Sequence, residues 1–326
     1  MKTILLVLIL ILACNCSSKQ IVIDMAGEKS GIIGSEFPLY NYITYIFTYI
    51  FGYSHWYGRL INLVVSSLGL YFFFELIKNL FNKQIAFTST LILTVSIWFA
   101  FSRKIMPDTF STALVLGGIW FGYQFLNRGG AARLVVFGLL TCAGMLSKVP
   151  AGILLPVLGL TLLQREVTSA RKGWLLAVGF MALLPILWWY GYWSGHLTAT
   201  YGKAKFFLGT SVGAGGGELL GHLSEVAHRF YFDAVKFSGF VAFAAGTVLL
   251  IVKKNAAGKA VLAITSLAML AYMLKAGKAF YHHGYYVVPF VPVMALVAGY
   301  GLAQIKKSWW LALALLVVAT ERVLNQ

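Results

Sequence analysis

The sequence LINLVVSSLGLYFFFELI, residues 60–77, is an apolar run that contains one charged residue, Glu75. A helix crosses a bilayer with about 20 apolar residues, or fewer if it is tilted. Similar runs of about 15–21 residues recur toward the C-terminus, near 85–101, 109–126, 134–147, 149–163, 174–194, 237–252, 260–274, 285–304 and 308–320. These runs predict membrane-spanning helices along most of the chain.

The composition agrees with this interpretation, because 60% of the 326 residues are hydrophobic and only 11% are charged. A soluble globular domain of this length carries more charge. Within lipid only helices and closed barrels satisfy the backbone, and the runs lack the alternating pattern of barrel strands. The sequence therefore predicts an all-α polytopic transmembrane bundle of about 10–11 spans.

The charges are divided unequally between alternate loops. One set of loops holds twelve bases and a single acid, Glu166; the bases are Lys78, Lys83, Arg128, Arg133, Arg165, Arg171, Lys172, Lys253, Lys254, Lys259, Lys306 and Lys307. The positive-inside rule makes these loops cytoplasmic. The opposite set holds all six histidines together with Asp24, Glu28, Glu36, Asp108, Glu218, Glu225 and Asp233. We expect an integral multi-pass protein of a bacterial inner or plasma membrane whose chemistry faces outward.

The net charge of +16 does not indicate nucleic-acid binding. About half of the bases lie in short inner loops, where orientation and contact with anionic membrane lipid account for them. No soluble segment combines a dense basic run with interleaved aromatic residues. The three cysteines give no disulfide framework.

Three regions are expected along the chain. Residues 1–18 form either a cleaved signal-like segment or a first transmembrane helix, and both readings place Ser17 outside. Residues 19–57 form an outer loop with a juxtamembrane helix, because the tyrosines at 40, 42, 45 and 49 suit the headgroup level better than the lipid interior. Residues 58–326 form the bundle, with its largest outer loop at 194–236.

Two short outer segments combine carboxylates with bases. Glu36 is either a helix cap or a carboxylate held at the membrane surface. In the loop 102–109, Asp108 is either the cap of the following span or part of a site with Arg103 and Lys104. Fixed cations stabilise a departing phosphate, and a carboxylate accepts the proton of an incoming hydroxyl.

Further bases and imidazoles border the outer surface. Arg59 and Lys148 either extend toward the headgroups or line the mouth of the bundle; the short turn at Leu146-Ser-Lys-Val-Pro150 favours the second reading for Lys148. His282 and His283 either bind a metal, donate to phosphate, or belong to an aromatic belt. Because adjacent side chains rarely reach one ion, at most one of the two histidines is expected to be a ligand.

Taken in order, these segments resemble the membrane-embedded glycosyltransferases of family 39. The relatives include dolichyl-phosphate-mannose–protein mannosyltransferases and the aminoarabinose transferase of lipid A. The resemblance rests on Gly34-Ser-Glu-Phe-Pro-Leu-Tyr-Asn-Tyr-Ile43, Gly58-Arg-Leu60, Ser102-Arg-Lys-Ile-Met-Pro-Asp108, Leu146-Ser-Lys-Val-Pro150 and His283-Gly-Tyr-Tyr-Val-Val-Pro289. It implies the C-type glycosyltransferase architecture.

The resemblance also implies a function: inverting transfer of a sugar from a polyprenyl-phosphate donor to an acceptor glycan, lipid or protein at the outer face. By motif, Asp108 and Glu36 would be catalytic, and Asp24 is the candidate that would replace the family's N-terminal acid. The donor would be bound by Arg59, Arg103, Lys104, Lys148, His283 and Tyr285, and a divalent metal by Glu36 with His282.

The sequence departs from the family pattern at three places. Phe37 stands where aminoarabinose transferases carry a phosphate-binding lysine, and the surroundings of Asp24 and Glu28 do not match the family's N-terminal acidic motif. The chain also ends soon after a span, which suggests a protein shortened at both ends. Two alternatives therefore stay open: a noncatalytic homologue that binds lipid-linked sugar, and a transporter or flippase. The near absence of mid-span charge weighs against ion-coupled transport.

Overall fold

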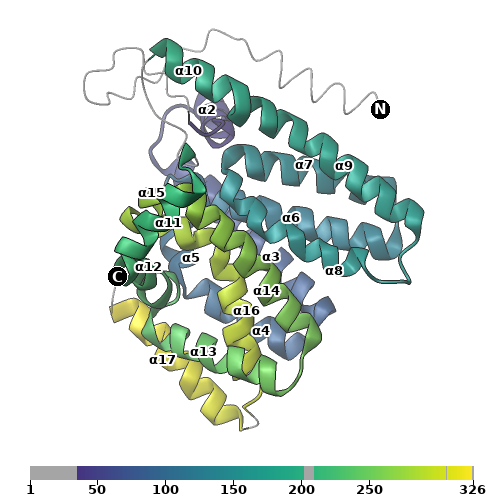
Figure 1. The fold of residues 1–326 in the computed structure, drawn as a ribbon, viewed down its shortest axis with the longest axis vertical. Coiled ribbons are helices and arrows are strands. Elements are labelled where there is room, and N and C mark those ends of the chain that lie inside the picture. The colour runs from purple at the N-terminus through teal and green to yellow at the C-terminus, as the bar shows by residue number, and fades with distance from the viewer. Residues whose placement is uncertain (1–34, 202–208, 306, 325–326) are drawn as a thin grey trace.

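The computed structural model describes residues 35–201, 209–305 and 307–324, and every regular element in these ranges is a helix. Figure 1 shows the helices packed as one bundle. The predicted all-α membrane architecture is therefore confirmed. In chain order the elements are α2 Leu39–Phe51, α3 Trp56–Leu80, α4 Lys83–Thr94, α5 Ile97–Phe101, α6 Pro107–Arg128, α7 Ala131–Ser147, η1 Val149–Val157, α8 Leu158–Leu162, α9 Ser169–Trp188, η2 Trp189–Trp193, α10 Ser194–Tyr201, α11 Val212–Gly221, α12 Leu223–His228, η4 Arg229–Ala234, α13 Lys236–Val252, α14 Ala256–Ala276, α15 Lys278–His282, η5 Gly284–Phe290, α16 Val291–Leu302 and α17 Ser308–Leu324.

Several predicted spans are broken or short. By length and composition, four of the described helices are long and apolar enough to cross a membrane, or five if the bent pair formed by Leu223–Ala234 and Lys236–Val252 counts as one span. The run 85–101 divides into α4 and α5 because Ser96 accepts a hydrogen bond from the Trp98 amide and starts a new helix. The run 149–163 begins as a 3-10 helix with Pro156 inside it. The ten or eleven spans predicted from the sequence are thus apolar runs, and only some of them form uninterrupted helices.

One span is longer than predicted. The helix α9 continues through η2 into α10 without a break, so that Ser169–Tyr201 forms a single 33-residue helical segment. Its outer end carries closely packed rings, including a stacked pair of Trp188 and Trp193.

The predicted juxtamembrane helix is present as α2. Its buried residue is Tyr40, whereas Tyr49, Ile50 and Phe51 are mostly exposed. The helix thus has one face on the bundle and one apolar face free, as an interfacial helix requires. Its position on a membrane surface stays a prediction.

Contacts between loops agree with the two-sided charge pattern. Among the loops predicted to be inner, Gln84 donates to the Ala303 carbonyl, Lys253 to Gln304, and Arg171 to the Asn127 carbonyl. The elements of the opposite set, α2, α10, α11, α12 and α15, gather at the upper and left edges of Figure 1. The bundle therefore has two chemically distinct ends.

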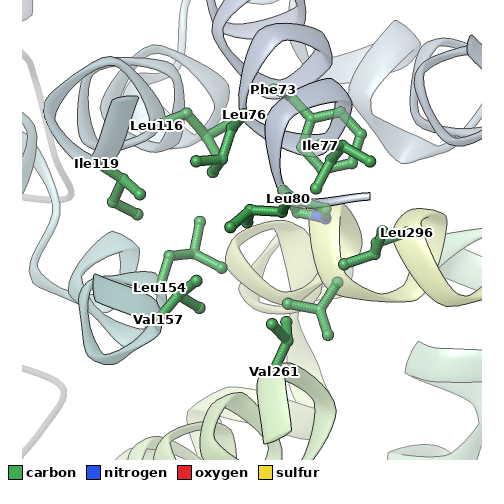
Figure 2. Close-up of a pocket in the computed structure, with 12 residues that line it drawn as sticks. Phe73, Leu76, Ile77, Leu80, Leu116, Ile119, Leu154, Val157, Val261 and Leu296 are labelled. Atoms are coloured by element: carbon green, nitrogen blue, oxygen red, sulfur yellow. The ribbon is translucent and has the colours of Figure 1, made fainter. Parts of the chain in front are cut away.

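The helices approach one another closely at small residues. On α4, Thr88 donates to the Gly299 carbonyl of α16 over 2.8 Å. On α13, Gly246 lies directly against the backbone of α16 near Val297. A small apolar cavity of about 30 Å³ remains where α3, α6, η1, α14 and α16 meet, with Phe73, Leu116, Leu154 and Val261 in its wall (Figure 2).

Candidate active site

The site forms at the turn between α7 and η1. There Lys148 has an extended backbone, which ends α7 before Pro150 enters the 3-10 helix. The turn is tied to α6 by Ser111, whose hydroxyl lies 2.7 Å from the Gly144 carbonyl and 3.1 Å from the Lys148 carbonyl. These bonds fix the point from which the Lys148 side chain projects.

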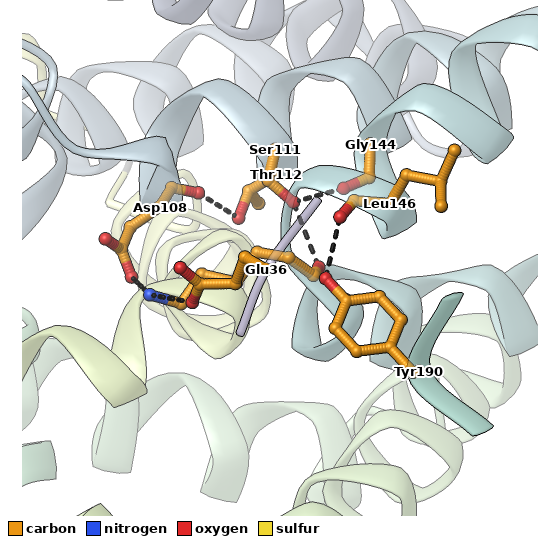
Figure 3. Close-up of polar contacts among 8 residues, drawn as sticks. Glu36, Asp108, Ser111, Thr112, Gly144, Leu146 and Tyr190 are labelled. Carbon is orange, nitrogen blue, oxygen red and sulfur yellow. Dashed lines mark hydrogen bonds and ion pairs between the residues drawn. The ribbon is translucent and has the colours of Figure 1, made fainter. Parts of the chain in front are cut away.

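Two carboxylates converge on the Lys148 ammonium. Its Nζ lies 2.7 Å from Oδ1 of Asp108 and 3.3 Å from Oε1 of Glu36. Figure 3 shows Glu36 and Asp108 facing each other across this point. The side chains of Lys148 and Asp108 are 6% and 1% exposed, whereas that of Glu36 is 30% exposed. Glu36 is therefore the member of the group that a substrate can reach.

The position of Asp108 is set by the start of α6. Pro107 occupies the first turn, where its missing N–H costs nothing, and Asp108 follows it. The preceding loop is held by Asn62 of α3, whose Nδ2 lies 2.8, 2.8 and 3.1 Å from the carbonyl oxygens of Phe101, Lys104 and Met106. The Asn62 carbonyl oxygen accepts from Thr109. One buried amide thus anchors both sides of Asp108.

The position of Glu36 is set by backbone bonds on either side of it. The Phe37 amide donates to the Leu146 carbonyl, and the Trp189 indole donates to the Ser35 carbonyl. The rings of Phe37 and Trp189 also meet edge to face. These contacts join the start of the described chain to the ends of α7 and α9.

Aromatic rings cover the open side of the ammonium. Lys148 Nζ lies 4.7 Å from the ring centre of Tyr285 and 5.6 Å from that of Tyr286. The ring of His283 stacks on Tyr285 at 5.2 Å. The predicted outer residues His283 and Tyr285 thus lie beside the Lys148 ammonium, and the Tyr285 ring contacts both of the other side chains.

Charges explain the protonation states at this site. Burial lowers the pKa of Lys148, but the negative charges of Asp108 and Glu36 more than offset this and raise that pKa above its ordinary value. The ammonium is therefore charged at neutral pH. Burial, followed by the charges of His282, Arg229 and Lys148, lowers the pKa of His283. A neutral imidazole is the expected form of His283.

The other predicted site residues lie elsewhere. Lys104 is exposed with its ammonium over the Phe101 ring, and Arg103 lies over the Phe99 ring at 3.9 Å. Neither base forms an ion pair with Asp108, so the compact Arg103–Lys104–Asp108 group expected from the sequence does not form in the described residues. Arg59 is exposed at the start of α3. Asp24 lies outside the described residues.

The described residues do not fit a metal centre. Carboxylate oxygens are suitable ligands for a divalent cation, but those of Glu36 and Asp108 already face an ammonium that would repel one. The described part of the chain contains no group of three His, Cys, Asp or Glu side chains placed to bind an ion. His282 is exposed and packs against Tyr281. The metal predicted at Glu36 and His282 stays a prediction and enters no step below.

Sequence reasoning missed several residues around the site. The Tyr190 hydroxyl donates to the Leu146 carbonyl at 2.6 Å (Figure 3), and Tyr190 also lines a hollow of about 1030 Å³ with Thr198, Thr210, Glu218 and Lys278. Asn62 and Ser111 lie inside spans, where polar residues are functional or structural by default. That rule was the signal in the sequence that could have identified them.

We expect Asn62→Ala to lower stability and activity together. The change removes the amide donor that the Lys104 and Met106 carbonyls share, whereas the Phe101 carbonyl keeps the Lys104 amide as a donor. An unsatisfied buried group costs about 1–3 kcal/mol. The melting temperature of the purified protein should fall by several degrees, roughly 2–4 °C per kcal/mol. Asn79→Ala is the matched control, because Asn79 lies on the same helix but is exposed and bonds only the Glu75 carbonyl. Equal melting temperatures for the two variants would contradict the anchoring role.

The fold and site define a class: the chain is an integral membrane protein of the C-type glycosyltransferase architecture. Residues 35–189 match the family model described as dolichyl-phosphate-mannose-protein mannosyltransferase. The matched segment contains Glu36, Asp108 and Lys148. The resemblance to family 39-like membrane glycosyltransferases is therefore confirmed.

Two solved structures share the fold. The chain resembles ArnT from Cupriavidus metallidurans bound to undecaprenyl phosphate, with a TM-score of 0.56, 16% identity and coverage of 90% of this chain and 54% of that one. The apo state of ArnT from the same organism gives a TM-score of 0.55, 16% identity and coverage of 90% and 53%. The chain thus spans about half the length of these structures. No curated protein sequence matches it.

Proposed function

We propose that this protein transfers a sugar from a polyprenyl-phosphate donor to an acceptor hydroxyl at the outer face of a bacterial membrane, with inversion at the anomeric carbon. The observation that carries the proposal is the convergence of Glu36 and Asp108 on Lys148 inside the segment that matches the family model. The undecaprenyl phosphate bound to ArnT supports a donor of this lipid class.

In the proposed reaction the acceptor hydroxyl gives its proton to the Glu36 carboxylate. The acceptor oxygen forms a bond to the anomeric carbon as the bond between that carbon and the phosphate oxygen breaks, and the electron pair leaves with the polyprenyl phosphate. Glu36 suits the role of base because it is the exposed carboxylate of the group. The hollow beside Tyr190 is wide enough to admit an acceptor or a sugar.

Lys148 and Asp108 are assigned supporting roles. Asp108 is too deeply buried to contact a substrate, so it acts through Lys148, which it holds charged and in place. Lys148 in turn orients Glu36 through their ion pair. The exposed bases Arg59 and Lys104 and the rings of Tyr285 and His283 stay the predicted contacts of the donor phosphate and sugar.

The test uses the purified full chain with undecaprenyl-phosphate-linked pentoses and hexoses, and measures the release of undecaprenyl phosphate. We expect turnover by the wild-type protein and a fall of roughly 10²–10⁴ in Glu36→Gln, the usual contribution of general base catalysis. Because Gln is nearly isosteric, the melting temperature should change little. Glu166→Gln, which alters an acid of an inner loop, is the control and should retain full turnover.

Two outcomes would contradict the proposal. Wild-type turnover in Glu36→Gln would remove the base from the mechanism. Tight binding of the lipid-linked sugars without release of undecaprenyl phosphate would instead favour the noncatalytic reading.

A further inference from the structure

A second group of charged side chains lies where α17 meets the start of α13, away from the Lys148 site. Arg322 of α17 is 7% exposed and Lys236 of α13 is 5% exposed. The positive charge of Lys236 acts on Arg322, as does that of Arg103 from the α5–α6 loop, and the negative charge of Asp233 acts on both Arg322 and Lys236. Arg103, assigned to the donor by motif, is therefore close enough for its charge to act on Arg322.

None of these three bases has an anionic partner among the described residues. Arg322 forms no hydrogen bond or ion pair there, and its Nε is fully buried without an acceptor. Within the described ranges, Lys236 lies over the Phe232 ring at 3.7 Å and feels the charges of Asp233 and Glu321 without an ion pair to either, and Arg103 donates to the Phe99 carbonyl. Arg103 is exposed, but Arg322 and Lys236 are buried, and burying a charge without a partner is strongly unfavourable.

The two acids nearby are already engaged. Asp233 forms an ion pair with Arg229. Glu321 accepts hydrogen bonds from the amides of Phe237 and Ser238 and from the Ser238 hydroxyl. The Glu321 carboxylate thereby caps the N-terminus of α13. The bases around Arg322 therefore outnumber the carboxylates that are free to pair with them.

The backbone at Lys236 is also unusual. Lys236 has a φ of 63°, in the left-handed region that favours glycine, immediately after the sharp bend at Val235. A lysine retained at such a position costs stability that a glycine would not. Backbone strain of this kind is found most often at residues whose side chains bind a ligand or take part in a reaction.

We infer that Arg322, Lys236 and Arg103 form a binding site for a phosphate group, carried by an anionic lipid or free in solution. A guanidinium and an ammonium together suit the geometry and charge of phosphate oxygens. The exposed apolar surface of α17, including Trp309, Leu313 and Leu316, places lipid next to the site. The inference is independent of the proposed transferase function.

The experiment measures the melting temperature of the detergent-solubilised full chain with phosphatidylglycerol, with phosphatidylcholine and with inorganic phosphate. We expect phosphatidylglycerol or inorganic phosphate, but not phosphatidylcholine, to raise the melting temperature by roughly 3 °C or more at saturation. A shift with the lipid alone identifies a headgroup, and a shift with inorganic phosphate as well identifies a site open to free anion.

Two variants remove the site in different ways. Arg322→Gln removes the buried guanidinium, and Lys236→Gly removes the ammonium while it keeps the left-handed backbone. Both should abolish the shift. Lys254→Gly is the matched control, because Lys254 also has a positive φ, of 52°, but lies in an inner loop; its shift should equal that of the wild type.

Without added phosphate, Arg322→Gln should melt no lower than the wild type, because an unpaired buried charge has been removed. The inference is overturned if neither probe shifts the wild-type melting temperature, or if the shift persists in both site variants. It is also overturned if Arg322→Gln is strongly destabilised without phosphate, which would show that the chain itself supplies the partner.

Discussion

We expect Asp108→Asn to lower the proposed transfer at least about a hundredfold in turnover, because the Lys148 ammonium then keeps Glu36 as its one ion-pair partner among the residues that the structure describes. We expect the Glu36 carboxylate to be drawn toward the buried ammonium and away from the acceptor. Removing one partner of a buried ion pair also costs about 3–5 kcal/mol, so the melting temperature should fall as well. Both quantities are measured on the purified full chain.

The double variant Asp108→Asn/Lys148→Met separates these two effects. Removing both partners leaves no unpaired buried charge, and the melting temperature should return toward that of the wild type. Turnover should not return, because Glu36 has lost the group that orients it. Wild-type turnover in Asp108→Asn alone would refute the proposed role. Recovery of turnover together with stability in the double variant would show that the pair is only structural.

Gly246→Ala disrupts the packing of α13 on α16. A Cβ at Gly246 would overlap the Val297 carbonyl oxygen and lie 2.8 Å from the Val297 carbonyl carbon. No side-chain rotation relieves a clash with backbone, so the helices must separate. We expect a loss of at least about 3 kcal/mol, the upper part of the range for overpacked cores, and a low yield of monodisperse protein.

Gly173→Ala is the matched control for this substitution. Gly173 lies in α9, and a Cβ there meets nothing within 4 Å. Alanine favours a helix over glycine by up to about 1 kcal/mol, so this variant should be as stable as the wild type or more so. If the two alanine variants melt alike, the close approach of α13 and α16 is not essential to the fold.

Much of the architecture follows from hydrophobic runs, because a bilayer imposes one length scale on every span. The breaks within runs do not follow from hydropathy. Ser96 and Pro156 divide apolar segments through local hydrogen bonding and ring geometry, which a window average hides. The predicted all-helical fold was therefore more reliable than the predicted count of spans.

Some residues of the site could be predicted from sequence motifs, whereas others depend on how side chains pack in the folded protein. Family motifs identified Glu36, Asp108 and Lys148, and the structure brings these three side chains together. The motif could not specify the direction of Arg103, because a base in a short loop can turn to either side. Arg322 lies far away along the chain and carries no motif, so only the packing of α17 reveals that its charge and that of Arg103 act on each other.

The unbroken helical segment Ser169–Tyr201 is longer than the hydrocarbon core of a bilayer is thick. At 1.5 Å per residue its 33 residues extend about 50 Å, whereas the hydrocarbon core is only about 30 Å thick. If the helical segment begins at the inner boundary of the hydrocarbon core, its last four or so turns, next to the hollow that Tyr190 lines, are expected in the headgroup layer or beyond it. A thicker membrane would bury this end of the helix in hydrocarbon, so the proposed activity of the protein should depend on lipid chain length.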